Sequence, residues 1–432
     1  MKNRKALALI AILALVAAAC GGSDGGSDEA VVEVETTEAP ATTEAPTTTA
    51  APAPASDPLI LASLMPLSGD LASLGPGIAL GAALAVEQIN AAGGINGQPV
   101  QLIEGDSGYD GAVALTSLND VIAQGAQGVM GAACSSTSLA ILDTAIAAEV
   151  VMISPSNTSP QFTKIDKKGF YARTAPSDLL QGDVLASLLV EDGVQTVSII
   201  SRADSYGRGL AEATAAAFEA AGGTVKTIVY HATDASEFTS EVTAVGKGGA
   251  DAIVGILFPE TGCGVLQPAF EQGLLDTPWY MTDGVKDAGL ASLCGLGTAL
   301  DGFKGTAPGS AAGEAKDAFE AAYAEVSADG SPTFIFAPQA YDAVMLMAIS
   351  AAANGVTGPE IASGLVAASS GGEKCIGVAC IALAADGVDV DYVGASGEIE
   401  LDAVGDPTAA TYDIWTTEGD TNPVLRSVDF GS

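Results

Sequence analysis

The chain is short of positive charge, histidine and cysteine, and each shortage excludes a class of function. Its 432 residues hold 16 Lys and Arg against 53 Asp and Glu, which gives a formal net charge of −37. A surface of this sign repels nucleic acid and anionic lipid headgroups, so we expect no nucleic-acid partner. With one histidine and six cysteines, none of them at zinc-ligand spacing, we expect no metal site and no cofactor.

Motifs of catalysis are also scarce. The segment Gly75-Pro76-Gly77-Ile78-Ala79-Leu80-Gly81 has Leu80 where a dinucleotide-binding loop needs its third glycine. Residues 21–25 match the G-x-S-x-G pattern of hydrolases, but no strand or helix is predicted around them. His231 follows a predicted strand, and we expect a surface or turn residue and not a catalytic base. The sequence therefore predicts that the protein is not an enzyme; an exported hydrolase is disfavoured because no plausible base is present.

The N-terminus has the pattern of an export signal. Lys2, Arg4 and Lys5 precede an apolar run over residues 6–19, as in a signal peptide. Residues 17–21, Ala-Ala-Ala-Cys-Gly, resemble a bacterial lipobox, in which the cysteine is acylated after cleavage. No later segment is long and apolar enough to span a bilayer. We predict a signal peptide over residues 1–20, a lipid anchor on Cys20 and an extracytoplasmic location, at the cell surface or in a periplasm; a plain secreted protein is the alternative.

Composition changes sharply after this signal. Residues 21–57 are rich first in Gly and Ser and then in Thr-Glu-Ala-Pro repeats. Such a stretch cannot bury a core, so we predict a disordered, low-complexity tether. From Pro58 onward, apolar strand-like runs alternate with helical periodicity as far as Met281, and this predicts parallel sheets covered by helices. The alternation is too long for one flavodoxin-like sheet, and the length of the chain allows two domains; a closed eight-stranded barrel also fits the pattern.

Small hydroxyl residues follow two of the predicted buried strands. Ser135 comes after the apolar run 129–133, and Ser156 and Thr158 come after the run 150–153. Ligands of open α/β sheets bind at the carboxyl ends of strands, and a helix N-terminus beside hydroxyl groups suits an anion. We predict that these residues hold a small carboxylate or amide; ordinary helix caps are the alternative.

Three further strands end in aromatic or acidic residues. Tyr206 follows the strand 197–200, Phe258 follows 254–256, and Asp283 follows 279–281. A turn tyrosine and a helix-capping acid would each explain one of these positions. Because several strand ends carry such residues, a shared cleft explains them better.

Export also makes disulfides possible. Cys263 and Cys294 flank one helix-plus-strand unit, and Cys375 and Cys380 bound a short glycine-containing loop. We expect each of these as a candidate pair. Cys134 lies outside both.

Five segments together resemble a known family. They are Leu67-Ser68-Gly69, Ile89-Asn90-Ala91-Ala92-Gly93-Gly94-Ile95-Asn96-Gly97, Cys134-Ser135-Ser136, Ser205-Tyr206-Gly207-Arg208-Gly209 and Ala340-Tyr341-Asp342-Ala343-Val344. In this order and spacing they resemble the type I periplasmic binding proteins, and among these the leucine/isoleucine/valine-binding proteins of ABC importers. The similarity runs from about Pro58 to the C-terminus.

The resemblance implies two doubly wound parallel-sheet lobes joined by a three-strand hinge. We assign residues 58–175 and 308–393 to the N-terminal lobe, and 176–307 and 394–432 to the C-terminal lobe. In the family, positions like Ser135 and Thr158 hold the ligand's α-carboxylate. Backbone at the position of Ser156 and an acid at the position of Asp283 hold its α-ammonium.

Other positions complete the implied site. Aromatics like Tyr206 and Phe258 line the second lobe. Three departures stand out: Leu74 replaces an aromatic of the first loop, Asp283 is one methylene shorter than the usual Glu, and the cysteine expected near Gly108-Tyr109 as the partner of Cys134 is missing.

The resulting prediction is an extracytoplasmic solute-binding lipoprotein of an ABC importer. It would capture a small amino acid, branched-chain or similar, or a related amide by cleft closure, and deliver it to an ABC permease. The membrane would be contacted through the lipid anchor only. A ligand-sensing receptor module of the same fold is the alternative.

Overall fold

The computed structural model describes residues 57–69, 71–331 and 334–430. The predicted signal peptide, Cys20 and all but the last residue of the predicted tether lie outside these ranges. The fold described below is that of the unit that begins at Pro54.

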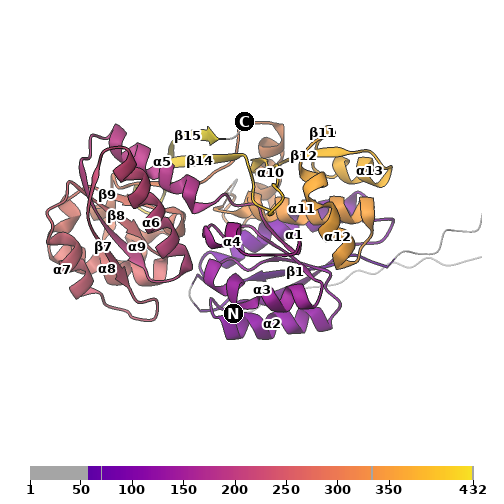
Figure 1. Cartoon of the computed structure of the whole chain (residues 1–432), viewed down its shortest axis with the longest axis horizontal. Helices are drawn as coiled ribbons and strands as arrows, with labels where there is room; N and C mark the ends of the chain where they lie inside the picture. Colours follow the sequence, from indigo (N-terminus) through magenta and orange to yellow (C-terminus); the bar gives the residue numbers. More distant parts are fainter. Residues whose placement is uncertain (1–56, 70, 332–333, 431–432) are drawn as a thin grey trace, which may run out of the picture. The chain divides into compact units, whose positions relative to one another are not determined.

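The first lobe is built on a five-stranded parallel sheet (Figure 1). Its order is β2-β1-β3-β4-β5, with bounds Gln101–Asp106, Ile60–Met65, Gly128–Gly131, Val151–Ser154 and Tyr171–Arg173. Every residue of β3 and β4 is buried, as expected for parallel strands covered on both faces. The helices of this lobe are α1 (Gly75–Ala91), α2 (Gly111–Ala123), α3 (Ser135–Ala147), α4 (Gln161–Lys164), α10 (Glu314–Val326), α11 (Ala337–Asn354), α12 (Gly358–Ser369) and α13 (Ala379–Ala385).

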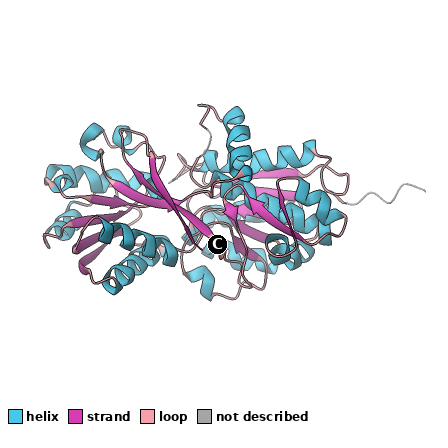
Figure 2. Ribbon diagram, turned by 90° about the horizontal axis from the view of Figure 1, so that it is seen from above, coloured by secondary structure: helices cyan, strands magenta, loops and turns pink. Residues whose placement is uncertain are grey.

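The second lobe is built on a seven-stranded sheet of order β15-β14-β10-β9-β8-β6-β7. The bounds in that order are Val424–Phe430, Ala410–Thr416, Lys304–Pro308, Trp279–Met281, Ala252–Ile256, Thr196–Arg202 and Thr224–His231. Strands β6 to β10 pair in parallel, whereas β14 and β15 are antiparallel additions. Its helices are α5 (Asp178–Glu191), α6 (Ser205–Ala220), α7 (Thr239–Gly246), α8 (Pro259–Glu271) and α9 (Leu290–Leu293), with short 3-10 turns η1 (Leu274–Asp276), η2 (Asp283–Val285) and η3 (Gly297–Leu300). Figure 2 shows helices on both sides of the strands in each lobe.

Three stretches of chain connect the lobes: between β5 and α5, between β10 and α10, and between β13 and β14. A small third sheet, β11-β12-β13, precedes the last of these, with bounds Glu373–Ile376, Val390–Gly394 and Gly397–Glu398. Asp406, in the connection after β13, forms an ion pair with Arg173 of β5 at 2.7 Å. This connection therefore packs on the first lobe until β14 begins, while the lobe boundaries predicted from the sequence stay predictions.

Cysteine pairing follows local proximity. Cys263 of α8 is bonded to Cys294, next to α9. Cys375 of β11 is bonded to Cys380 of α13. Cys134 is buried and lies outside both disulfides.

Three sequence expectations need correction or completion. The sheets are separate and open, so the fold is not a closed eight-stranded barrel. His231 is not a surface residue: it is fully buried at the end of β7 and packs 4.5 Å from the ring of Phe238. Burial lowers the pKa of His231, because it disfavours the charged imidazolium. The edge strand β15 was not expected, because its residues are mostly exposed and lack an apolar run.

Candidate functional site

Residues from both lobes line one small cavity. The first lobe contributes Pro66, Leu71, Leu74, Ile78, Ala133, Cys134, Ser135, Ser156 and Phe336, and the second contributes Tyr206, Phe258, Asp283 and Gly284. Its volume is about 30 Å³, which is enough for about one or two water molecules. Six of the seven ligand-binding residues predicted from the sequence meet here: Leu74, Ser135, Ser156, Tyr206, Phe258 and Asp283.

The first-lobe wall is formed by the ends of two neighbouring strands. Ser135 is the first residue of α3, so backbone N–H groups of that first turn have no partner within the helix. The hydroxyl of Ser156, which follows β4, donates to the carbonyl oxygen of Ala133 at 2.9 Å. Asn157 donates from Nδ2 to the same oxygen, also at 2.9 Å. These bonds hold the loops after β3 and β4 against each other.

A buried ion pair supports this wall from behind. Arg173 donates from Nη1 to the carbonyl oxygens of Asn157 at 3.2 Å and Ser159 at 3.0 Å. Its other nitrogens hold both carboxyl oxygens of Asp406. Thr158 lies between the two anchored carbonyls. It is fully buried and is not among the residues that line the cavity.

The second-lobe wall centres on Asp283, which starts η2 directly after β9. Its Oδ1 accepts hydrogen bonds from Gln181 Nε2 at 2.7 Å and from the Tyr206 hydroxyl at 2.9 Å. Burial raises the pKa of Asp283 to about 6, although both hydrogen bonds oppose the rise. A carboxylate in this setting gains from a cationic ligand, because the ligand's charge offsets the cost of burying its own.

A second carboxyl group lies near Asp283 and was missed from the sequence. Asp178 starts α5 and is fully buried. Burial raises its pKa well above the usual range, and the charge of Asp283 raises it further. Thr-Ala-Pro-Ser-Asp at residues 174–178 reads as an ordinary capped helix start, so no local signal distinguished it. Gln181 was missed for the same reason: one turn into a helix, it looks like a surface residue.

The remaining lining is apolar. Leu71 and Leu74 precede α1, Ile78 lies in its first turn, and Phe336 immediately precedes α11. All four are buried, with exposed fractions of 6% or less. The cavity thus combines hydroxyl and amide groups on one side, a carboxylate on the other and an aliphatic and aromatic lining. Chemically, this combination suits a small zwitterion with an apolar substituent.

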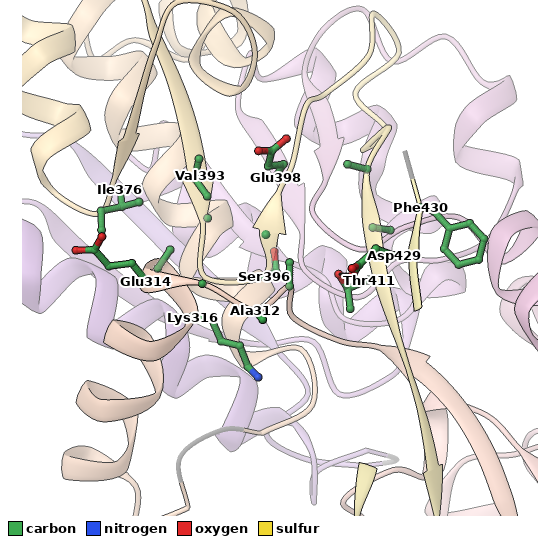
Figure 3. Close-up of a pocket in the computed structure, with 17 residues that line it drawn as sticks. Ala312, Glu314, Lys316, Ile376, Val393, Ser396, Glu398, Thr411, Asp429 and Phe430 are labelled. Atoms are coloured by element: carbon green, nitrogen blue, oxygen red, sulfur yellow. Dashed lines mark hydrogen bonds between the residues drawn. The ribbon is translucent and has the colours of Figure 1, made fainter. Parts of the chain in front are cut away.

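A larger cavity of about 330 Å³ lies elsewhere, between the start of α10 and strands β12, β13, β14 and β15 (Figure 3). Figure 3 shows Glu314 and Lys316 on one side of it and Asp429 and Phe430 on the other. Three of its charged groups already have partners: Lys316 pairs with Glu320, Glu398 pairs with Lys374, and Asp429 accepts from Thr411. It contains none of the predicted ligand-binding residues.

Neither membrane nor metal features accompany the candidate site. Within residues 57–69, 71–331 and 334–430, no helix has the length and apolarity needed to cross a bilayer. The same described residues contain no cluster of three or more metal-ligating side chains.

Together, two α/β lobes and a cavity lined from both define a two-lobed ligand-binding protein. The profile of the family described as periplasmic binding protein matches residues 58–374. This covers well over half of the chain, so the chain belongs to the periplasmic binding protein family.

Individual relatives agree with this assignment. An amino acid binding protein of Pseudomonas aeruginosa is 34% identical over 238 residues, which cover 53% of this chain and 62% of that protein. The chain therefore spans less than two thirds of that relative. The leucine-, isoleucine-, valine-, threonine- and alanine-binding protein of the same organism is 30% identical over 304 residues, covering 68% of this chain and 78% of the relative.

Solved structures share the fold. A leucine-binding protein, LivK, of Thermotoga maritima matches with a TM-score of 0.73 and 20% identity, covering 86% of this chain and 98% of that one. The substrate-binding protein LivJ of a branched-chain amino acid transporter from Streptococcus pneumoniae, solved with isoleucine, matches with a TM-score of 0.72 and 23% identity, covering 87% and 100%. The type I periplasmic-binding fold predicted from the sequence is confirmed.

Proposed function

We propose that the protein is the extracytoplasmic solute-binding component of an ABC importer and captures a small α-amino acid, branched-chain or similar, or a related amide. The observation that carries the proposal is the lining of the small cavity. Ser135 and Ser156 face Asp283 across it, and leucine, isoleucine and phenylalanine side chains complete it.

Each part of the ligand has a matching wall. The free N–H groups at the start of α3 and the hydroxyl of Ser135 would hold the α-carboxylate, with Thr158 as a second hydroxyl on the same side. Asp283 and the loop at Ser156 would hold the α-ammonium. Charge-assisted hydrogen bonds of this kind contribute roughly 1.5–3 kcal/mol each.

The ligand would enter when the lobes separate. A cavity of about 30 Å³ cannot admit even a small amino acid, and its lining comes from both lobes. Separation of the lobes exposes both walls, and a ligand that contacts both favours the closed arrangement. The protein would therefore work as a clamp and not as a catalyst.

Export and anchoring complete the proposal. The basic and apolar N-terminus followed by Ala-Ala-Ala-Cys20 supports export and acylation of that cysteine. The protein would then be held at the membrane by lipid and would deliver its ligand to a permease. The Pseudomonas aeruginosa relative named for binding leucine, isoleucine, valine, threonine and alanine supports the same ligand class.

A thermal-shift screen of the domain from Pro58 onward tests this proposal. We expect leucine, isoleucine, valine or another aliphatic α-amino acid to raise the melting temperature, because a ligand that binds only the native state stabilises it. The corresponding amides are screened beside them, and compounds that lack the α-amine serve as controls. A shift produced only by compounds without an α-amine would remove Asp283 from the proposed ammonium site; no shift with any amino acid or amide would contradict the ligand class.

A further inference from the structure

One cluster of side chains joins the two lobes beside the cavity. Tyr109 lies in the first lobe, in the loop between β2 and α2, whereas Arg202 ends β6 of the second lobe and Asp204 caps α6. The Tyr109 hydroxyl donates to Asp204 Oδ2 at 2.5 Å and accepts from Arg202 Nη2 at 2.5 Å. Arg202 Nε also donates to Asp204 Oδ2, at 2.9 Å. A single hydroxyl from one lobe thus completes an ion pair of the other.

This ion pair is largely removed from water. The Arg202 side chain is fully buried and that of Asp204 is 9% exposed. Burial alone would lower the pKa of Arg202, but Tyr109 and Asp204 together raise it. Hydrogen bonds to buried charges are stronger than those between neutral groups, and breaking one leaves a costly unpaired partner. The hydroxyl of Tyr109 is therefore in a position to affect how readily the lobes part.

The same cluster contacts a wall of the cavity. The Arg202 guanidinium lies 4.2 Å from the centroid of the Phe258 ring, and Tyr109 meets that ring edge-on at 5.8 Å. Tyr206 stacks on Phe258 at 5.2 Å. Phe258 lines the cavity, so its ring is held by side chains from both lobes.

The backbone of Tyr109 is also unusual. Its φ is 54°, in the left-handed region that residues with a Cβ seldom adopt. Such conformations persist where surrounding contacts determine them, and they gather at binding and switch regions. The contacts of Tyr109 with the second lobe are of this kind.

We propose that Tyr109 is an interlobe latch: its bonds to Arg202 and Asp204 exist only when the lobes are together, and they set how long a bound ligand is retained. The inference rests on the proposed function, because it concerns release from the same cavity. The latch does not touch the ligand. Its loss should therefore speed dissociation and leave association, which starts from separated lobes, nearly unchanged.

The test is Tyr109→Phe, which removes only the hydroxyl. With L-leucine as the probe and stopped-flow measurement, we expect the dissociation rate to rise about tenfold and the association rate to change less than about twofold. Tyr280→Phe is a matched control. Tyr280 donates to Asp192 at 2.7 Å, and Lys304 pairs with that same carboxylate. These three residues repeat the tyrosine–carboxylate–cation arrangement entirely within the second lobe. Tyr280→Phe should therefore leave both rates unchanged.

A dissociation rate for Tyr109→Phe equal to that of Tyr280→Phe would overturn the latch. A second measurement does not need a ligand: the unfolding equilibrium of Tyr109→Phe, Asp204→Asn and the double variant in urea. The latch predicts a coupling of about threefold or more between the two changes. If leucine and other amino acids do not bind at all, the proposed function fails, and this cycle still decides about the latch, because additive effects would overturn it.

Discussion

The two walls of the candidate site are built from different chemistry. The first-lobe wall uses neutral groups, Ser135 and Ser156, held by hydrogen bonds to nearby backbone. The second-lobe wall uses titratable groups: Asp283 lines the cavity, and Asp178 and Tyr206 lie close enough to affect one another's pKa.

Because of this difference, the first wall should contribute mainly to stability and the second mainly to ligand binding. Neutral hydroxyls satisfied by backbone cost the folded protein little, so the first wall is stable whether or not a ligand is present. Buried carboxyl groups without a cation favour the protonated form and lower stability once they ionise. A cationic ligand group relieves this penalty at the second wall, so that wall should carry most of the pH dependence and most of the ligand discrimination.

Replacing Asp283 should have the largest effect on the second wall. Asp283→Ala should weaken binding of an α-amino acid tenfold or more by calorimetry, at roughly 1.4 kcal/mol per decade. Asp283→Asn keeps an oxygen that can accept from Gln181 and Tyr206 but removes the charge. It should weaken binding similarly. Unchanged affinity in either variant would exclude Asp283 as the ammonium partner.

Although Asp283→Asn should weaken binding, it should stabilise the ligand-free protein. Asp283 has a folded pKa of about 6, raised from 3.8, so the native state binds more protons than the unfolded state between these values and loses stability as pH rises through them. At pH 7, Asp283→Asn should be more stable than wild type by up to about 3 kcal/mol in urea unfolding. A variant less stable than wild type would show that the ionised carboxylate stabilises the folded protein.

The affinity of the wild-type protein for its ligand should fall at low pH. Because an ammonium group needs ionised Asp283, the association constant should be level above about pH 6 and fall by up to about tenfold per unit below it. Calorimetry from pH 7.5 to 4.5 measures this fall. Asp283→Asn should show little of it, and an equally steep fall in that variant would assign the titration to another group.

On the first wall, Ser135→Ala should weaken binding by about tenfold, since one hydrogen bond to a carboxylate contributes roughly 1.5 kcal/mol or more. Ser138→Ala is its control. Ser138 lies on the same helix and is fully buried, with its hydroxyl donating to the Ala132 carbonyl at 3.1 Å, but it does not line the cavity. It should lower stability and leave affinity unchanged; equal losses of affinity would mean that Ser135 acts only through the fold.

Asp178→Asn should have the smallest effect on binding. The folded pKa of Asp178 is raised by burial and by Asp283, so folding favours the protonated carboxyl, which Asn resembles. Affinity should change less than about twofold. Wild type should lose stability with rising pH more steeply than the variant, since the native state keeps a proton that the unfolded state releases. Parallel stability curves as the pH rises above the unfolded pKa of 3.8 would contradict this assignment.

The residues at the strand ends were more predictable than the side chains that support them. Ser135 and Ser156 follow apolar runs directly, and the strand–helix junction places them at the sheet edge. Asp178 and Gln181 carry no such signal, because their helix start looks ordinary and their partner Asp283 is about a hundred residues away. His231 shows the same limit: its position after a strand was clear, but its burial depends on Phe238 and the helix that follows.

Local pattern therefore determined the α/β class, the alternation of strands and helices, the absence of an enzyme-like motif and the strand ends that carry polar residues. These depend on periodicities of two and 3.6 residues, which are properties of short segments. Tertiary structure decided which strand ends meet, that Asp283 is bound by Gln181 and Tyr206, and that Tyr109 reaches Arg202 and Asp204 in the other lobe. Burial, pKa and contacts between lobes depend on distances between remote segments, and sequence spacing does not contain those distances.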